Sequence, residues 1–180
     1  MDSTLQSKAA RIRLVVLDVD GVLTDGSIWI GDDGEAVKRF YTRDGLGIKL
    51  LQCAGIPVAL LTGRLSKQTA SRAAELGIKT VMQGKAFKGG AFEELVQSFG
   101  LDTEEVAYMG DDIPDIPPLK AAGLAACPAD AANEVLPLAD FVSSAPGGNG
   151  AVRSLVELIL RAQNRWDDLV TRHYVQGESR

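Results

Sequence analysis

Short apolar runs recur along this chain, separated by longer segments whose apolar residues are spaced as on one face of a helix. Unbroken runs of this length are typical of strands that are buried on both faces of a parallel sheet. The predicted strands are residues 13–18 (RLVVLD), 57–61 (PVALL), 79–82 (KTVM), 105–109 (EVAYM), 124–127 (LAAC) and 140–142 (DFV).

The segments between these runs carry helix signals, namely polar residues suited to an N-cap and glycines suited to a helix end. The predicted helices are residues 45–55, after the possible N-cap Asp44 and ending at Gly55, residues 66–77, from Ser66 to Gly77, residues 91–100, ending at Gly100, and residues 151–162. Alternating strands and helices predict an α/β fold with a Rossmann-like, doubly wound parallel sheet. Ligands of such sheets bind beyond the carboxyl ends of the strands.

One segment departs from this alternation. Residues 27–42 (SIWIGDDGEAVKRFYT) contain two strand-like runs around the turn sequence GDDG at 31–34, which predicts a β-hairpin. The hairpin follows the loop richest in acidic residues, so it is either a flap over a functional site or an ordinary surface hairpin.

The composition fits one globular unit. The chain has 180 residues, 46% of them hydrophobic and 24% charged, without an internal repeat or a low-complexity linker. That proportion supports a sizeable core. We therefore expect a single domain over residues 1–180, with a core at about 11–163 and a C-terminal tail at 164–180.

Charge and apolar run length exclude several classes of partner. The formal net charge of -5 argues against a general affinity for nucleic acid or for an anionic membrane. The longest apolar runs, such as residues 57–61, are far shorter than the roughly 20 residues of a membrane helix. Cys53 and Cys127 lack CxxC spacing and fit small core residues in a reducing compartment. We expect a cytoplasmic protein without nucleic-acid or membrane partners.

Candidate chemistry begins at the end of the first predicted strand. Asp18 and Asp20 stand two residues apart in DVDG, at the sheet edge where an α/β protein binds its ligand. A DxD pair alone is common and usually forms a solvated turn or an incidental metal site. Its meaning therefore depends on what the later strand ends carry.

Those later strand ends carry three further motifs. With LDVDGVLTDG at 17–26, the sequence has TGR at 62–64, Lys88, and GDD at 110–112. In this order they resemble the four motifs of phosphatases of the haloacid dehalogenase superfamily. The resemblance implies a magnesium-dependent phosphomonoesterase with the fold of that superfamily.

The resemblance assigns the reaction to the first motif. Asp18 would attack phosphorus and form an aspartyl-phosphate, which splits one difficult displacement into two easier ones. Asp20 would protonate the leaving alcohol and then activate the hydrolytic water, as a general acid and base.

A carboxylate that attacks a phosphate dianion needs a cation to offset the repulsion, and Mg²⁺ is a hard ion that prefers oxygen ligands. The resemblance implies that Asp18, the main-chain carbonyl of Asp20, and Asp111 bind this Mg²⁺. Asp112 would lie behind these ligands or assist as one of them.

The second and third motifs would hold the phosphate. Thr62 offers a hydroxyl, Gly63 a nearby backbone N–H, and the helix that starts near Ser66 directs its positive end to the same place. The alternative for TGR is a plain strand-to-helix turn. Lys88 fits the lysine that neutralises phosphate and nucleophile; Lys85 is the other candidate, and a solvated lysine is the alternative for both.

The spacing between motifs leaves no room for a cap domain over the site. The hairpin, FYTRDGLG at 40–47 and APGGNGAVR at 145–153 resemble a capless subgroup of the superfamily, over nearly the whole chain from Arg13 to about Gln163. The resemblance implies a homotetramer whose active sites are completed by neighbouring subunits.

The same resemblance implies a sugar-acid phosphate as substrate. The first candidate is 3-deoxy-D-manno-octulosonate 8-phosphate (KDO 8-phosphate), in lipopolysaccharide precursor biosynthesis. A sialic-type 9-phosphate is an alternative, and so is a non-catalytic module that keeps the fold for assembly. Arg43, Arg64 and Arg153 are candidates for binding the substrate carboxylate, because guanidinium groups bind carboxylates in bidentate fashion; surface or interface arginines are the alternative.

Three further features are left open by the sequence. Asp115 is either an extra acid near the metal or a carboxylate that favours the start of a helix. Gly147, Gly148 and Gly150 are read as a structural turn before the last helix rather than a phosphate loop. Trp166 and Tyr174 either dock on a neighbouring subunit or pack on the core of their own chain.

Overall fold

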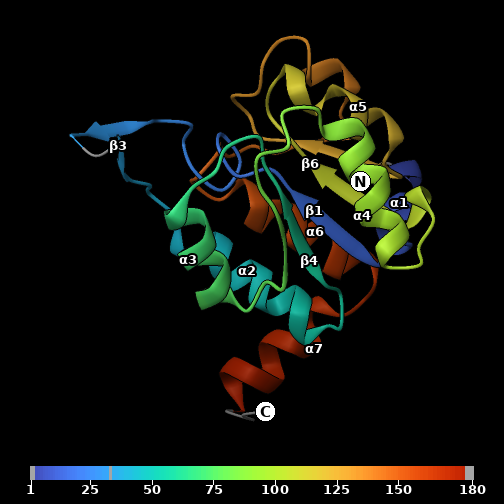
Figure 1. The fold of residues 1–180 in the computed structure, drawn as a ribbon. Helices are drawn as coiled ribbons and strands as arrows, with labels where there is room; N and C mark the ends of the chain where they lie inside the picture. Colours follow the sequence, from blue (N-terminus) through green and yellow to red (C-terminus); the bar gives the residue numbers. More distant parts are fainter. Residues whose placement is uncertain (1–2, 33, 177–180) are drawn as a thin grey trace.

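The structure is a computed structural model that describes residues 3–32 and 34–176. Its centre is a six-stranded parallel sheet in the order β5-β4-β1-β6-β7-β8 (Figure 1). The strands are β1 (Leu14–Leu17), β4 (Val58–Leu61), β5 (Thr80–Met82), β6 (Val106–Met109), β7 (Leu124–Cys127) and β8 (Phe141–Val142). All six predicted strands are confirmed.

Helices cover both faces of this sheet, as a doubly wound fold requires. One face carries α1 (Ser3–Ala10), α2 (Thr42–Cys53), α3 (Lys67–Leu76), α6 (Ala151–Ala162) and α7 (Trp166–Val170), and the other carries α4 (Lys88–Ser98) and α5 (Ile116–Ala121). Short 3-10 turns lie at Thr103–Glu105, Ile113–Asp115 and Leu136–Leu138, and a π-helical turn lies at Thr171–Val175.

The two faces have separate apolar cores because successive side chains of a strand point to opposite sides. Val15 and Leu17 of β1 join the core under α2 and α6, whereas Leu14 and Val16 join the core under α4. All four side chains are fully buried, which explains the unbroken apolar run in the sequence.

The central position of β1 sets the place of the site. β1 pairs with β4 on one side and with β6 on the other, so the chain reverses its direction of strand addition beside β1. Loops that follow neighbouring parallel strands separate at such a reversal and leave a crevice at the carboxyl edge.

The helix boundaries correct one prediction. Asp44 is not the N-cap of α2, since that helix begins at Thr42 and Asp44 is buried within its first turn. The Asp44 carboxylate instead accepts hydrogen bonds from the backbone N–H groups of Gly150 (3.1 Å) and Arg153 (2.8 Å) at the start of α6. Burial raises the pKa of Asp44 although these hydrogen bonds favour its charged form.

The predicted start of α3 is confirmed. The Ser66 side chain accepts a hydrogen bond from the backbone N–H of Thr69 (3.3 Å) at the N-cap of α3. Gly77 ends α3 at φ 73°, in the left-handed region that glycine adopts without strain.

The predicted hairpin forms β2 (Trp29–Gly31) and β3 (Gly34–Val37), a separate antiparallel sheet that projects from the α/β body (Figure 1). Its side chains Trp29 and Ile30 are 63% and 79% exposed. Among the described residues, the chain between β1 and α2 forms no other regular element, so no cap domain lies there.

The C-terminal helix packs on its own chain. Trp166 is buried in the core cluster, and the guanidinium groups of Arg153 and Arg161 lie 4.8 and 5.2 Å from its ring centroid. The reading of Trp166 as a core residue is thus the one the structure supports. In the ranges that the structure describes, no helix is both long and apolar enough to cross a membrane.

Candidate active site

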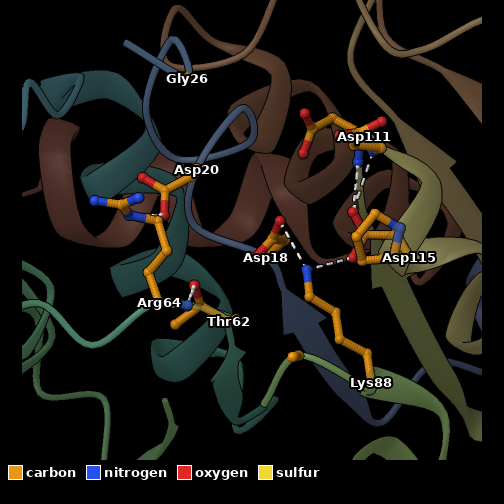
Figure 2. Close-up of a pocket in the computed structure, with 12 residues that line it drawn as sticks. Asp18, Asp20, Gly26, Thr62, Arg64, Lys88, Asp111 and Asp115 are labelled. Carbon is orange, nitrogen blue, oxygen red and sulfur yellow. Dashed lines mark hydrogen bonds and ion pairs between the residues drawn. The ribbon is translucent and has the colours of Figure 1, made fainter. Parts of the chain in front are cut away.

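A cavity of about 420 Å³ opens at the carboxyl edge of the sheet, where the loops after β1, β4 and β6 meet (Figure 2). Most of the predicted site residues line this cavity. They are Asp18, Asp20, Thr62, Gly63, Arg64, Lys88, Asp111 and Asp112. The cavity also takes in Asp115, whose role the sequence left open.

The floor of this cavity is a buried ionic cluster. The Lys88 ammonium lies 2.9 Å from Asp18 Oδ2 and 2.6 Å from Asp115 Oδ1 (Figure 2). The side chains of Asp18 and Lys88 are only 9% and 4% exposed. Lys88 is the first residue of α4, so the start of that helix brings its side chain to the strand edge. Lys88 rather than Lys85 therefore contacts the predicted nucleophile.

Asp115 holds several groups of the cavity in place through hydrogen bonds. Its Oδ1 accepts hydrogen bonds from Lys88 and from the Tyr108 hydroxyl, both at 2.6 Å. Its Oδ2 accepts from the backbone N–H groups of Asp111 (3.0 Å) and Asp112 (3.2 Å). The fully buried carboxylate thus fixes both the lysine and the backbone of the GDD motif.

Burial and mutual repulsion shift the acid groups of this cluster. The pKa of Asp18 rises to about 7, first because the group is buried and then because Asp115 repels it, while Lys88 acts in the opposite direction. The pKa of Asp111 rises to about 8 through burial and then through repulsion by Asp18 and Asp115. Burial alone would lower the pKa of Lys88, but Asp18 and Asp115 offset that effect and raise it.

The cluster fits a divalent metal ion. Carboxylate oxygens of Asp18, Asp111 and Asp115 lie within 4.8 Å of one another. When all groups are ionised, the three carboxylates and the Lys88 ammonium have a net charge of -2. Oδ1 of Asp18 and Oδ1 of Asp111 are buried without a hydrogen-bond partner among the described residues. Unpaired buried carboxylate oxygens are costly unless a cation binds them, and oxygen ligands suit Mg²⁺.

Glycines pack the loop of Asp20 tightly against this cluster. Gly21 has φ 87°, and a Cβ atom there would lie 2.0 Å from Asp111 Oδ2. A Cβ atom at Gly110 would lie 2.4 Å from the Cβ of Asp115.

The GGNG segment supports the same loop from the other side. A Cβ atom at Gly147 would lie 1.8 Å from the main-chain oxygen of Gly21, and the Gly148 N–H donates to the Val22 carbonyl (2.9 Å). These contacts agree with the structural reading of the segment. We call Gly21, Gly110 and Gly147 the close-packed glycines.

The carboxylate of Asp20 has two cations beside it. The Lys38 ammonium pairs with Oδ1, and Arg64 Nε lies 3.9 Å from Oδ2. Lys38 carried no signal in the sequence, where a lysine after a strand reads as solvated. Thr62 is buried at the end of β4, and its hydroxyl accepts a weak hydrogen bond from the Arg64 N–H (3.4 Å).

Of the three nominated arginines, Arg64 is the one that lines the cavity. Arg43 is exposed in the first turn of α2. Arg153 lies on α6, where it pairs with Glu157 at 2.8 Å and covers the ring of Trp166. Within one chain, Arg43 and Arg153 therefore stand apart from the cavity.

Large exposed apolar side chains stand next in sequence to the residues that line the cavity. Leu65, Phe87 and Ile113 are 80%, 94% and 56% exposed, and each is next in sequence to a residue that lines the cavity. We call these three residues the apolar rim.

Comparisons with known proteins agree with this geometry. Residues 43–123 match the family described as haloacid dehalogenase-like hydrolase. The chain is 44% identical over 162 residues to 3-deoxy-D-manno-octulosonate 8-phosphate phosphatase KdsC of Escherichia coli strain K12, covering 90% of this chain and 86% of that protein.

Solved structures give the same result. The phosphatase of that name from Yersinia pestis superposes with a TM-score of 0.89 at 43% identity, covering 92% of this chain and 89% of the other. The one from Moraxella catarrhalis, in complex with magnesium ion, phosphate ion and a KDO molecule, has a TM-score of 0.91 at 38% identity, covering 94% and 98%.

Proposed function

The chain belongs to the haloacid dehalogenase-like hydrolases, and we propose that it hydrolyses KDO 8-phosphate to KDO and inorganic phosphate. The observation that carries the proposal is the buried cluster of Asp18, Lys88, Asp111 and Asp115 beneath an open cavity. Relatives of that activity match about nine tenths of the chain, which supports the choice of substrate.

Asp18 is the proposed nucleophile. It lies at the cavity floor with one oxygen held by Lys88 and the other without a hydrogen-bond partner in the described parts of the chain. Lys88 keeps the carboxylate oriented and adds positive charge where phosphate oxygens enter.

The proposed metal ligands are Asp18, Asp111 and the main-chain carbonyl of Asp20. Mg²⁺, when bound there, supplies the positive charge that offsets repulsion between carboxylate and phosphate. Asp115 fixes the backbone of Asp111, and Asp112 stands at the cavity edge behind it.

The remaining roles follow from position. Asp20 is the proposed acid in the first half-reaction and the base in the second. Thr62, the backbone N–H of Gly63, and Lys88 bind the phosphate oxygens. Arg64, at the side of the cavity, is the proposed partner of the substrate carboxylate.

We further propose that the active unit is a homotetramer whose subunits complete each other's sites, acting in the cytoplasm on a lipopolysaccharide precursor. The open cavity supports this, since no cap among the described residues covers a leaving group. The exposed apolar side chains of the hairpin, Trp29 and Ile30, also favour a buried role in an assembly.

The test is phosphate release from KDO 8-phosphate, a sialic-type 9-phosphate, hexose phosphates and p-nitrophenyl phosphate, with and without Mg²⁺, by the wild type and Asp18→Asn. We expect a Mg²⁺-dependent preference for KDO 8-phosphate that Asp18→Asn abolishes. A preference for the 9-phosphate would keep the mechanism and replace the substrate. Release that does not depend on Asp18 would refute the mechanism, and no release from any compound would favour an assembly module.

A further inference from the structure

A buried lysine stands beside the proposed acid and base. Lys38 follows β3 directly, and its side chain is only 2% exposed. Its ammonium forms an ion pair and hydrogen bond with Oδ1 of Asp20. Lysine is rarely buried unless it is paired, because removing the ammonium from water is costly. The pair with Asp20 therefore offsets part of the cost of burying Lys38.

The two carboxylate oxygens of Asp20 have different surroundings. Oδ1 is held by Lys38, whereas Oδ2 is buried and accepts no hydrogen bond from the residues that the structure describes. Arg64 Nε lies 3.9 Å from Oδ2, which is beyond hydrogen-bond length (Figure 2). Asp20 lines the cavity and Oδ1 is engaged by Lys38, so Oδ2 is the oxygen left for a leaving group or a water, which reaches it once the side chains that cover it move aside.

We propose that Lys38 is a positioning residue, which fixes the carboxylate of Asp20 so that Oδ2 transfers the proton in both half-reactions. An aspartate side chain otherwise rotates about two torsions, and proton transfer requires the oxygen to lie within hydrogen-bond reach of the reacting atom. A charge-assisted hydrogen bond in a buried setting is strong enough to select one orientation. The inference rests on the proposed function, because it gives Asp20 an acid and base role that depends on orientation.

The proton balance is simple. In the first half-reaction an Asp18 oxygen bonds to phosphorus, the bond from phosphorus to the sugar oxygen breaks, and the proton on Asp20 Oδ2 moves to that oxygen. In the second, water attacks phosphorus, its proton moves to Oδ2, and the bond from phosphorus to Asp18 breaks. Oδ2 ends the cycle protonated, and Oδ1 stays with Lys38 throughout.

The next residue provides a matched control. Arg39 pairs with Asp25 at 3.4 Å, and both side chains are largely exposed at 56% and 36%. Replacing Arg39 removes an ion pair from the same end of the hairpin without touching Asp20. Exposed pairs of this kind contribute little to stability.

The test compares two leaving groups. The sugar oxygen of KDO 8-phosphate needs a proton to depart, whereas p-nitrophenolate departs as a stable anion. Because kcat/KM reports steps up to release of the leaving group, it isolates the first proton transfer from the second. A positioning role therefore predicts a loss that depends on the leaving group, which a general structural defect would not produce.

For Lys38→Met we expect kcat/KM to fall about 10-fold or more for KDO 8-phosphate and only about 2-fold for p-nitrophenyl phosphate. Lys38→Arg should recover part of the loss, and Arg39→Met should leave both values within about 2-fold. In an Asp20→Asn background, Lys38→Met should cause no further loss on KDO 8-phosphate.

Several outcomes would overturn the inference. They are an equal loss on both substrates, no loss in Lys38→Met, or an additive loss in the Asp20→Asn background. Lys38→Met should still fold, since the Asp20 side chain is 20% exposed and can be solvated, and urea unfolding checks this. If Lys38→Met does not fold, Lys38→Arg decides by the same comparison of leaving groups. Failure of the proposed function appears separately, as absence of wild-type turnover.

Discussion

Replacing the proposed nucleophile by its neutral isostere should stabilise the metal-free protein at alkaline pH. Asp18 has a pKa of about 7 in the folded chain, against an ordinary value of 3.8. Ionising Asp18 therefore costs the folded state more than the unfolded state. The cost is absent below about pH 4, grows as the pH rises toward 7 and is complete above it. The neutral amide in Asp18→Asn carries no such cost, so the stability difference between the two proteins should grow with pH.

The structure sets the size of this effect. At about 1.4 kcal/mol per pKa unit, the shift from 3.8 to about 7 corresponds to about 4 kcal/mol of unfolding free energy. Asp18→Asn also removes a charge that raises the pKa of Asp111, which acts in the same direction. The wild type loses this unfolding free energy because its proposed function needs buried carboxylates that can bind a metal ion.

Urea unfolding of both proteins at pH 5 and pH 8, in the presence of a chelator, measures the difference. Asp18→Asn should be the more stable protein at pH 8, with a much smaller gap at pH 5. Excess Mg²⁺ should stabilise the wild type and narrow the gap, by about 2.7 kcal/mol when the ion is at 100 times its dissociation constant.

Asp25→Asn is the matched control. Asp25 lies on the same loop, and a hydrogen bond from the Ser27 N–H is the main reason that its pKa is lowered. This control should therefore gain no stability as the pH rises. The reasoning is refuted if Asp18→Asn is equal to or less stable than the wild type at pH 8 without metal, or if the gap does not change with pH.

Three further changes test other parts of the site. Gly147→Ala should lower the free energy of unfolding by about 1–3 kcal/mol in urea and remove most activity, because its methyl group would meet the Gly21 carbonyl. Gly90→Ala, with open space around it, should cause neither loss. Equal effects of the two changes would contradict the packing argument. Asp115→Asn should cost about 3–5 kcal/mol, because an amide cannot accept from all four donors; an unchanged melting temperature would rule this out. Arg64→Met should raise KM for KDO 8-phosphate but not for p-nitrophenyl phosphate, and a parallel rise for both would argue against a carboxylate contact.

The meeting of the predicted site residues could be foreseen because it depends on topology. Asp18, Thr62 and Asp111 each follow an apolar strand, and parallel strands of one sheet end at the same edge. Local signals also identified Ser66 as an N-cap, since its partner lies three residues away. Where strand order and short-range hydrogen bonds decide the position, sequence reasoning succeeds.

Contacts between distant elements could not be foreseen. Asp44 has the local context of an N-cap, but it bonds to Gly150, 106 residues later in the chain. Lys38 sits in a polar stretch typical of a solvated strand end, yet the fold buries it against Asp20. Asp115 shows the same limit, because its binding of Lys88 depends on how α4 approaches the loop after β6.

The close-packed glycines and the apolar rim are under opposite constraints. A side chain added at Gly21 or Gly110 would collide with the side chain of Asp111 or Asp115, and one added at Gly147 would collide with the main chain of Gly21, next to Asp20. Leu65 and Phe87, in contrast, point largely into solvent, so their replacement disturbs no packed neighbour to a comparable degree. Substitutions at the apolar rim can therefore change the substrate preference without disturbing the residues proposed to transfer the phosphoryl group. Directed evolution toward a different phosphorylated alcohol should accumulate changes at the apolar rim and leave the close-packed glycines unchanged.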